Sequence, residues 1–208
     1  YLSTLEEKNE FIKEEPQSEK WFKKWYGSKE FINQKPRYCL WLGDCPPNLL
    51  RKMPKSLERV KAVRDYRLAS KSPGTRKLAE TPTRFHVENI PDSNFLLIPR
   101  VSSERRRYIP IGFMSKDVLT SDSVLIVPNA KLYHFAILSS NVHMSWVRAV
   151  AGRLESRYRY SASIVYNNFP WVELTEDEKL KLKNTAQKIL DARKLYPESS
   201  LADLYDEL

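Results

Sequence analysis

The chain contains few of the residues that build catalytic and metal centres. Its 208 residues include three histidines (His86, His134 and His143) and two cysteines (Cys39 and Cys45), and none of these has metal-ligand spacing. The five glycines form no GxGxxG or P-loop motif, and neither GxSxG nor HExxH occurs. We therefore expect no catalytic residue, no metal site and no cofactor site within this chain.

Long apolar runs are missing as well. No segment reaches the roughly 20 apolar residues that span a bilayer, and no signal-peptide pattern is visible. Two cysteines without partner spacing are typical of reduced thiols in a cytosolic protein. We therefore expect a cytoplasmic location and no membrane partner.

The remaining composition is typical of a packed globule. Hydrophobic residues make up 41% of the sequence and aromatic residues 12%, and these fractions are higher than those typical of a disordered chain. The first residue is Tyr1 rather than Met, and the last residues, LADLYDEL, form a helical pattern that stops abruptly. We expect a folded piece of a longer protein.

Helical patterns surround a cluster of short strand patterns. Helices are expected at 3–15, 56–71, 130–140, 141–152 and 175–196, with another beginning at 199. Strands are expected at 36–43, 94–101, 107–113 and 123–127, with a strand and turn at 161–171. This order predicts an α+β fold with a small mixed β-sheet core, flanking helices and a C-terminal helical extension.

Capping residues and apolar spacing predict where the helices begin and which sides face inward. Ser3 with Glu6, and Thr175 with Glu178, have capping-box spacing. The helix at 141–152 is expected to be capped by Asn141 and ended by Gly152. The expected inward residues are Leu57, Val60, Val63 and Leu68 in the helix at 56–71, and Leu180, Ile189 and Leu190 in the helix at 175–196.

Positive charge is concentrated in the middle of the chain. Residues 31–172 carry 23 basic and 10 acidic side chains, whereas residues 1–30 carry 6 and 7 and residues 173–208 carry 6 and 9. A basic centre between near-neutral or acidic ends indicates a polyanion-binding surface, most often for nucleic acid. An ordinary solvated face would give the same balance, so both readings stay open at this point.

Three segments hold the densest basic clusters. They are 59–77 with its SPGT loop at 72–75, RVSSERRRYIPIGF at 100–113 and RLESRYRYS at 153–161. Arginine and lysine bind phosphates, arginine also reads guanine edges, and tyrosines between arginines suit base stacking and backbone tracking. The alternatives are a charged helix face and half-buried packing tyrosines.

Six motifs occur in an order that resembles one family. Residues 22–208 are similar to the C-terminal part of MmeI-type bifunctional restriction–modification enzymes (type IIL, within type IIG) and of related large adenine-specific DNA methyltransferases. The motifs are RYCLWL (37–42), RVKAVRDYRLASK (59–71), VSSERRRYIPIGF (101–113), HMSWVRAVAGRLESRYRYS (143–161), IVYNNFPW (164–171) and LADLYD (201–206).

The resemblance implies a place within a larger protein. In that family, one long chain carries a nuclease region, a helical connector, an adenine methyltransferase and then a target recognition domain. Residues 1–30 would be the helical linker after the methyltransferase, 31–172 the DNA target recognition domain and 173–208 a truncated C-terminal helical segment. S-adenosylmethionine would bind in the absent methyltransferase domain, an intramolecular partner, and Mg²⁺ in a nuclease domain if the parent has one.

The resemblance also implies sequence-specific binding of double-stranded DNA, with the neighbouring domain flipping an adenine out of the stack for N6 methylation. A motif that recurs across a family cannot distinguish one DNA sequence from another, so base readout is expected beside the motifs. The expected phosphate contacts are Arg64, Arg67, Lys71, Ser102, Ser103, Arg105, Arg106, Arg153, Arg157 and Arg159. The expected base-readout residues are Ser72, Thr75, Arg76, Lys77, Arg107, Ser115, Lys116 and Asp117.

The SSERRR segment has a further expectation of its own. Strand alternation would place Arg105 and Arg107 on one face, and Glu104 and Arg106 on the other. Glu104 is expected to pair with a neighbouring arginine, which leaves fewer arginines available to DNA.

Two other functions use the same features. One is an RNA-binding accessory domain, although no RRM, KH or OB signature is apparent. The other is a basic protein-interaction scaffold that docks on an acidic partner.

Overall fold

The computed structural model describes residues 2–88 and 90–206. The chain packs as two compact units. The first comprises Tyr1–Trp25, Pro36–Ile90 and Asp117–Leu119, and the second comprises Tyr26–Lys35, Pro91–Lys116 and Thr120–Leu208. The domain boundaries expected at 30/31 and 172/173 concern the parent protein and stay predictions.

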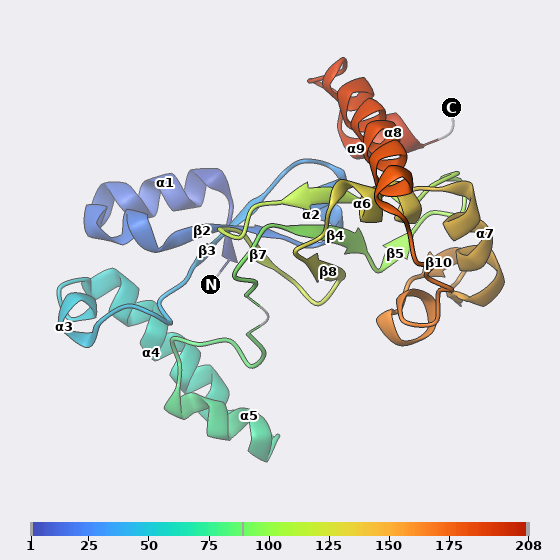
Figure 1. Cartoon of the computed structure of the whole chain (residues 1–208). Helices are drawn as coiled ribbons and strands as arrows, with labels where there is room; N and C mark the ends of the chain where they lie inside the picture. Colours follow the sequence, from blue (N-terminus) through green and yellow to red (C-terminus); the bar gives the residue numbers. More distant parts are fainter. Residues whose placement is uncertain (1, 89, 207–208) are drawn as a thin grey trace. The chain divides into compact units, whose positions relative to one another are not determined.

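Helices and small antiparallel sheets occur in the same chain, which confirms the α+β class (Figure 1). The strands are distributed over three small sheets, with the orders β1-β3-β2-β7, β5-β10-β9 and β6-β4-β8. None of the helices in the described ranges is long and apolar enough to cross a membrane.

The first unit is built around the four-stranded sheet. Its strands are β1 (Leu2–Ser3), β2 (Phe22–Tyr26), β3 (Arg37–Leu40) and β7 (Leu119–Thr120), of which β2 and β7 continue by one residue into the second unit. Its helices are α1 (Leu5–Glu14), α3 (Pro47–Leu50), α4 (Pro54–Leu68) and α5 (Pro73–Lys77), with 3₁₀ turns η1 (Pro16–Trp21) and η2 (Leu78–Glu80).

The predicted buried strand at 36–43 is confirmed as β3 and the residues after it. Leu40 and Leu42 pack with Phe11 and Met53 in one apolar cluster. Cys39 and Trp41, which alternate with them, pack with Leu119 in another. This alternation explains why the aromatic segment has no exposed face.

The helix α4 differs from the expectation for 56–71. It begins two residues earlier, and the expected inward residues Leu57 and Leu68 are 42% and 46% exposed. The side that faces the unit instead carries Ser56, Val60, Val63 and Arg67. Two of these side chains are apolar and the other two form hydrogen bonds, so polar contacts share in holding α4.

A buried carboxylate from a distant segment caps α4. Pro54 is the first residue of the helix, and the preceding Met53 offers no side-chain cap. Glu15, which is 3% exposed, accepts hydrogen bonds from the amides of Lys55 (2.8 Å) and Ser56 (3.1 Å) and from the Ser56 hydroxyl (2.5 Å). A negative charge at a helix N-terminus is favourable, and here it also satisfies donors that burial hides from water.

We expect Glu15→Ala to destabilise the first unit by about 2–4 kcal/mol, because charge-assisted hydrogen bonds are lost and buried donors are left unpaired. Urea unfolding followed by circular dichroism measures this loss. The matched control is Glu14→Ala, which removes a 56% exposed carboxylate that pairs with Lys55 and should cost less than about 1 kcal/mol. Equal losses for the two variants would contradict the capping role.

The second unit contains the other two sheets and the longer C-terminal helices. Its strands are β4 (Phe95–Pro99), β5 (Val101–Ser102), β6 (Gly112–Met114), β8 (Val124–Pro128), β9 (Gly152–Leu154) and β10 (Arg157–Arg159). Its helices are α2 (Ser28–Ile32), α6 (Leu132–Leu138), α7 (Asn141–Val150), α8 (Glu176–Lys194) and α9 (Leu201–Tyr205), with a π-helical turn η3 (Ala162–Tyr166).

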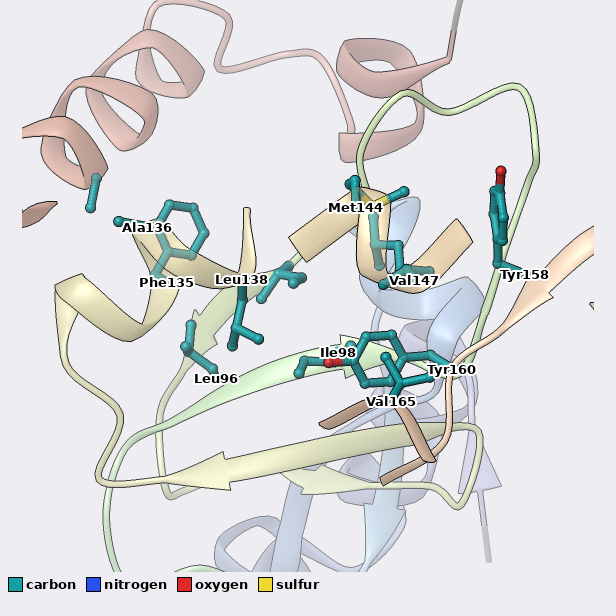
Figure 2. Close-up of a cluster of buried hydrophobic side chains, with 13 residues drawn as sticks. Leu96, Ile98, Phe135, Ala136, Leu138, Met144, Val147, Tyr158, Tyr160 and Val165 are labelled. Atoms are coloured by element: carbon teal, nitrogen blue, oxygen red, sulfur yellow. The ribbon is translucent and has the colours of Figure 1, made fainter. Parts of the chain in front are cut away.

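The core of the second unit lies between the strand β4 and the helices α6, α7 and α8. All five residues of β4 are buried, and Leu96 and Ile98 point into a cluster with Phe135 and Leu138 of α6 (Figure 2). Tyr160 and Val165 close the cluster from the segment after β10. The inward prediction for α8 is confirmed for Ile189 and Leu190, which pack on this core.

Other local expectations for the second unit were wrong. Of the expected strand 107–113, only Gly112 and Phe113 pair with β4, and the pairing extends to Met114; Pro110 has no amide to donate. Residues 162–166 form η3 because the Ser161 hydroxyl accepts from the amide of Ile164 and starts a helical turn. Leu180 is 54% exposed.

The start of α8 was predicted correctly, and that of α1 was displaced by one residue. Thr175 and Glu178 form the expected capping box of α8. The capping box of α1 uses Thr4 and Glu7 rather than Ser3 and Glu6, because Ser3 belongs to β1.

The cap of α7 is also one residue away from its expected position. Ser140 caps this helix in place of Asn141, and Gly152 begins β9 rather than ending the helix. The Asn141 carboxamide oxygen instead accepts a hydrogen bond from the Tyr108 hydroxyl.

Candidate nucleic-acid interface

Neither His134 nor His143 stands in an arrangement that would bind a metal ion. Among the described residues, no group of three or more His, Cys, Asp or Glu side chains could hold one. His134 accepts a hydrogen bond from the amide of Lys131 at 2.8 Å, at the start of α6. His143 is fully buried in the core of the second unit.

The His143 ring is a structural element of that core. Its Nε2 lies 2.9 Å from the Tyr160 hydroxyl, and the Phe169 ring packs edge-on against it. Its Nδ1 is buried with no hydrogen-bond partner in the described ranges. Burial lowers the pKa of His143 to about 4, so the imidazole is neutral in the folded chain at pH 7.

We expect the chain to lose stability as the pH falls below about 6.5. There the unfolded histidine takes up a proton that the folded one binds only near pH 4, so protons favour unfolding. The loss between pH 7 and 4 is about 3 kcal/mol for this one group. Urea unfolding at both pH values measures it. His143→Gln should remove this part of the pH dependence, whereas exposed His86→Gln should keep it; an unchanged pH profile in His143→Gln would contradict the assignment.

In the first unit, two of the candidate arginines bind backbone carbonyls of their own segment. Arg67 on α4 donates to the carbonyl oxygens of Leu78 (2.8 Å), Thr81 (2.9 Å) and Arg84 (2.7 Å). Arg76 on α5 donates to the carbonyls of Ser70 and Lys71, both at 2.9 Å. These guanidinium groups fasten the irregular chain after α4.

The other candidates of this segment differ in what they offer to a ligand. Ser72 caps α5 by accepting from the amide of Thr75, which is itself half-buried. Arg64, Lys71 and Lys77 are exposed. Their side chains form no ion pair within the part of the chain that the structure describes, so they are available to an anion.

We expect Arg67→Gln to loosen residues 78–84, because three carbonyl groups lose their donor. Hydrogen exchange measured by mass spectrometry should become faster for the amides of Thr81 and Arg84, whose turns contain these carbonyls. Arg64→Gln on the same helix removes an equal charge from an exposed position and should leave the exchange unchanged. Equal exchange rates in both variants would show that the hydrogen bonds from Arg67 to these carbonyl groups do not stabilise residues 78–84.

In the second unit, the sheet β5-β10-β9 separates its arginines onto two faces. Arg157 and Arg159 lie two residues apart on β10, on the side opposite Tyr158. Arg153 on β9 pairs with Tyr158, and its guanidinium stacks on that ring 3.8 Å from the centroid. Arg153 therefore covers an aromatic side chain, although Arg153 and Arg159 are both exposed.

The turn between β9 and β10 is held from two directions at Ser156. Arg153 donates to the Ser156 carbonyl at 3.0 Å. A backbone hydrogen bond and a hydrogen bond from Ser156 lower the pKa of the exposed Glu104 carboxyl, with smaller contributions from Arg105 and Arg157. The turn itself carries an exposed ion pair between Arg157 and Glu155 at 2.5 Å.

The SSERRR segment is a loop after β5, so strand alternation does not apply to it. Ser102 is 2% exposed and pairs with Tyr158 in the sheet, which argues against a phosphate contact. The Ser103 hydroxyl accepts from the amide of Arg105 within the turn. Arg106 is only 12% exposed and pairs with Asp206.

The expected pairing of Glu104 with an arginine does not occur as an ion pair among the described residues, although Arg105 and Arg157 both contribute to lowering the pKa of its carboxyl. Arg105 and Arg107 remain exposed in this loop. The candidates Ser115, Lys116 and Asp117 are exposed too, and the Lys116 amide donates to the Asn94 side chain.

Arg148 on α7 was not among the sequence-predicted site residues. It lies in the motif HMSWVRAV, in which most of the other residues are apolar, so the motif indicates a buried helix rather than a binding site. In the structure it is exposed, and its guanidinium donates to the carbonyl oxygen of Arg107 at 3.1 Å. No sequence pattern links these two positions, which are 41 residues apart.

An α+β chain with exposed arginine and lysine side chains in both units has the features of a nucleic-acid-binding module. The chain belongs to the family described as MmeI, target recognition domain, whose model matches residues 1–173. It is 39% identical over 205 residues to DNA methyltransferase A of Bacillus subtilis (strain 168), which covers 99% of this chain and 23% of that protein.

A solved structure is similar over the same length. This chain matches the type IIL restriction–modification enzyme MmeI in complex with DNA with a TM-score of 0.96 and 48% identity, over 99% of this chain and 28% of that one. The chain therefore spans about a quarter of the length of these relatives. The family predicted from six motifs is confirmed, and the matches also include residues 1–21, which those motifs did not cover.

Proposed function

We propose that this chain is the DNA recognition module of a larger restriction–modification enzyme or DNA methyltransferase that methylates adenine at N6. The observation that carries the proposal is the match to MmeI in complex with DNA, at 48% identity over 99% of the chain. The family model and the bacterial methyltransferase relative support the same function.

In this proposal the basic residues hold the duplex, and less recurrent positions read its sequence. The phosphate contacts are Arg64, Lys71, Arg105 and Arg159, which are exposed, and Ser103 and Arg157, which are half-buried. Arg67, Arg106 and Arg153 act on DNA indirectly, through the segments that they hold. Base readout is assigned to Lys77, Arg107, Ser115, Lys116 and Asp117, with Ser72, Thr75 and Arg76 shaping the α5 segment.

Catalysis belongs to other parts of the parent protein in this proposal. Its methyltransferase domain, with S-adenosylmethionine, transfers a methyl group to an adenine flipped out of the duplex. A nuclease domain, if the parent has one, uses Mg²⁺. The recognition module fixes the position of the duplex and thereby selects which adenine reaches the methyltransferase. The proposed location is the bacterial cytoplasm, where chromosomal and incoming DNA are both found.

We expect the 208-residue chain to bind duplex DNA at low salt, with affinity that falls as salt rises, because phosphate contacts release counterions. Fluorescence anisotropy with a labelled duplex measures this, and unlabelled duplex DNA, RNA and an acidic polypeptide serve as competitors. Duplex DNA should compete best. Stronger competition by RNA would favour an RNA-binding module, and binding to the acidic polypeptide alone would favour an interaction scaffold.

A further inference from the structure

We propose that Arg107 and Arg148 together form a binding site for one backbone phosphate of DNA. The inference rests on the proposed function, because DNA is the polyanion that this chain would meet. It adds Arg148 to the binding surface, and it changes the role of Arg107 from base readout to phosphate binding.

Two hydrogen bonds hold the segment 107–108 along the helix α7. The Tyr108 hydroxyl donates to the Asn141 side chain at 3.3 Å, at the first turn of the helix. The Arg148 guanidinium donates to the Arg107 carbonyl at 3.1 Å, at the last turn. Asn141 and Arg148 are about 10 Å apart along the helix axis, so the segment is fixed at two separated points.

This geometry brings the Arg148 guanidinium to the backbone of the residue that carries the second guanidinium. The charged end of Arg148 reaches the backbone of residue 107, and the Arg107 guanidinium lies over the neighbouring Tyr108 ring, 5.6 Å from its centroid. Both residues are exposed. A fixed backbone and a ring beneath Arg107 limit the freedom that it would lose on binding a ligand.

No carboxylate neutralises this pair within residues 2–88 and 90–206. Neighbouring arginines of the unit do have such partners: Arg106 pairs with Asp206 at 2.5 Å, and Arg157 with Glu155 at 2.5 Å. Asp206 lines the same pocket as Arg107, but its carboxylate is taken by Arg106. Arg107 and Arg148 form none of the ion pairs found in these ranges.

Two exposed positive charges that belong to one stretch of backbone favour a phosphate over a base edge as their ligand. Guanidinium groups that both bind one ligand repel each other, and an anion offsets that repulsion whereas a neutral guanine edge does not. A phosphate also offers several acceptor oxygens, which can take donors from both arginines at once. The pair therefore fits a phosphate shared by two arginines.

The test measures how the affinity of the 208-residue chain for a duplex depends on salt. We expect Arg148→Gln to make the slope of log K against log[salt] shallower by about 0.9, the value for one lost phosphate contact. Because one phosphate is shared, Arg107→Gln should give the same change and the double variant no more. Lys188→Gln, an exposed charge on α8 of the same unit, should leave the slope unchanged.

Folding is controlled for separately. The Arg107 side chain donates no hydrogen bond within the described ranges, so Arg107→Gln should keep the wild-type melting temperature even if Arg148→Gln lowers it. Arg148→Lys keeps the charge and should restore most of the slope.

Three results would overturn the inference while wild-type DNA binding upholds the proposed function. The first is a slope of log K against log[salt] in both single variants that equals the slope of Lys188→Gln. The second is additive changes of that slope in the double variant. The third is a changed DNA sequence preference in Arg107→Gln, which would indicate base readout. Failure of the wild-type chain to bind any duplex at low salt would overturn the proposed function and this inference together.

Discussion

Arginine side chains that donate to backbone carbonyl groups hold the irregular segments of both units. Arg67 and Arg76 fasten the chain around α5, Arg153 fixes the turn between β9 and β10, and Arg148 holds the loop after β5. Carbonyl groups outside helices and sheets need donors, and one guanidinium supplies five in a rigid planar arrangement. At Arg67 the planar fork matters most, because it donates to three carbonyl groups of residues 78–84 at once, a geometry that the single ammonium group of lysine does not match.

This use of arginine divides the positive charge of the chain into two classes. Some guanidinium groups are already bonded within the fold, as in Arg67 and Arg106, while others such as Arg105 and Arg159 are exposed. The bonded class still matters for a ligand, because it determines where the exposed class stands. A recognition surface made of loops needs such fastening, since loops that order only on binding lose affinity to the ordering.

The buried polar groups follow the same logic at the centre of each unit. Glu15 completes the N-terminus of α4 in the first unit, and the His143–Tyr160 pair lies inside the second. A histidine kept neutral by burial contributes packing and a hydrogen bond at neutral pH. In acid it destabilises the folded chain, because protonation is easier in the unfolded chain. Neither group is placed as a catalytic residue would be, because each is enclosed by the core that it supports.

Local patterns in the sequence determined the α+β class, the strand β3 and the helix α8 with its capping box. They also determined the family to which the chain belongs. Periodicity, capping and motifs are all properties of a few neighbouring residues, so the sequence alone contains them. The expected inward stripe of α4 was right for Val60 and Val63 and wrong for Leu57 and Leu68, because hydrogen bonds with Glu15 and residues 78–84 place Ser56 and Arg67 on the inward side. The burial of Ser102, the pairing of Arg106 with Asp206 and the approach of Arg148 to Arg107 join residues distant in sequence. The composition gives the number of arginines. Only the tertiary structure decides which of them remain available to a ligand, because the partners of a guanidinium group are set by long-range packing.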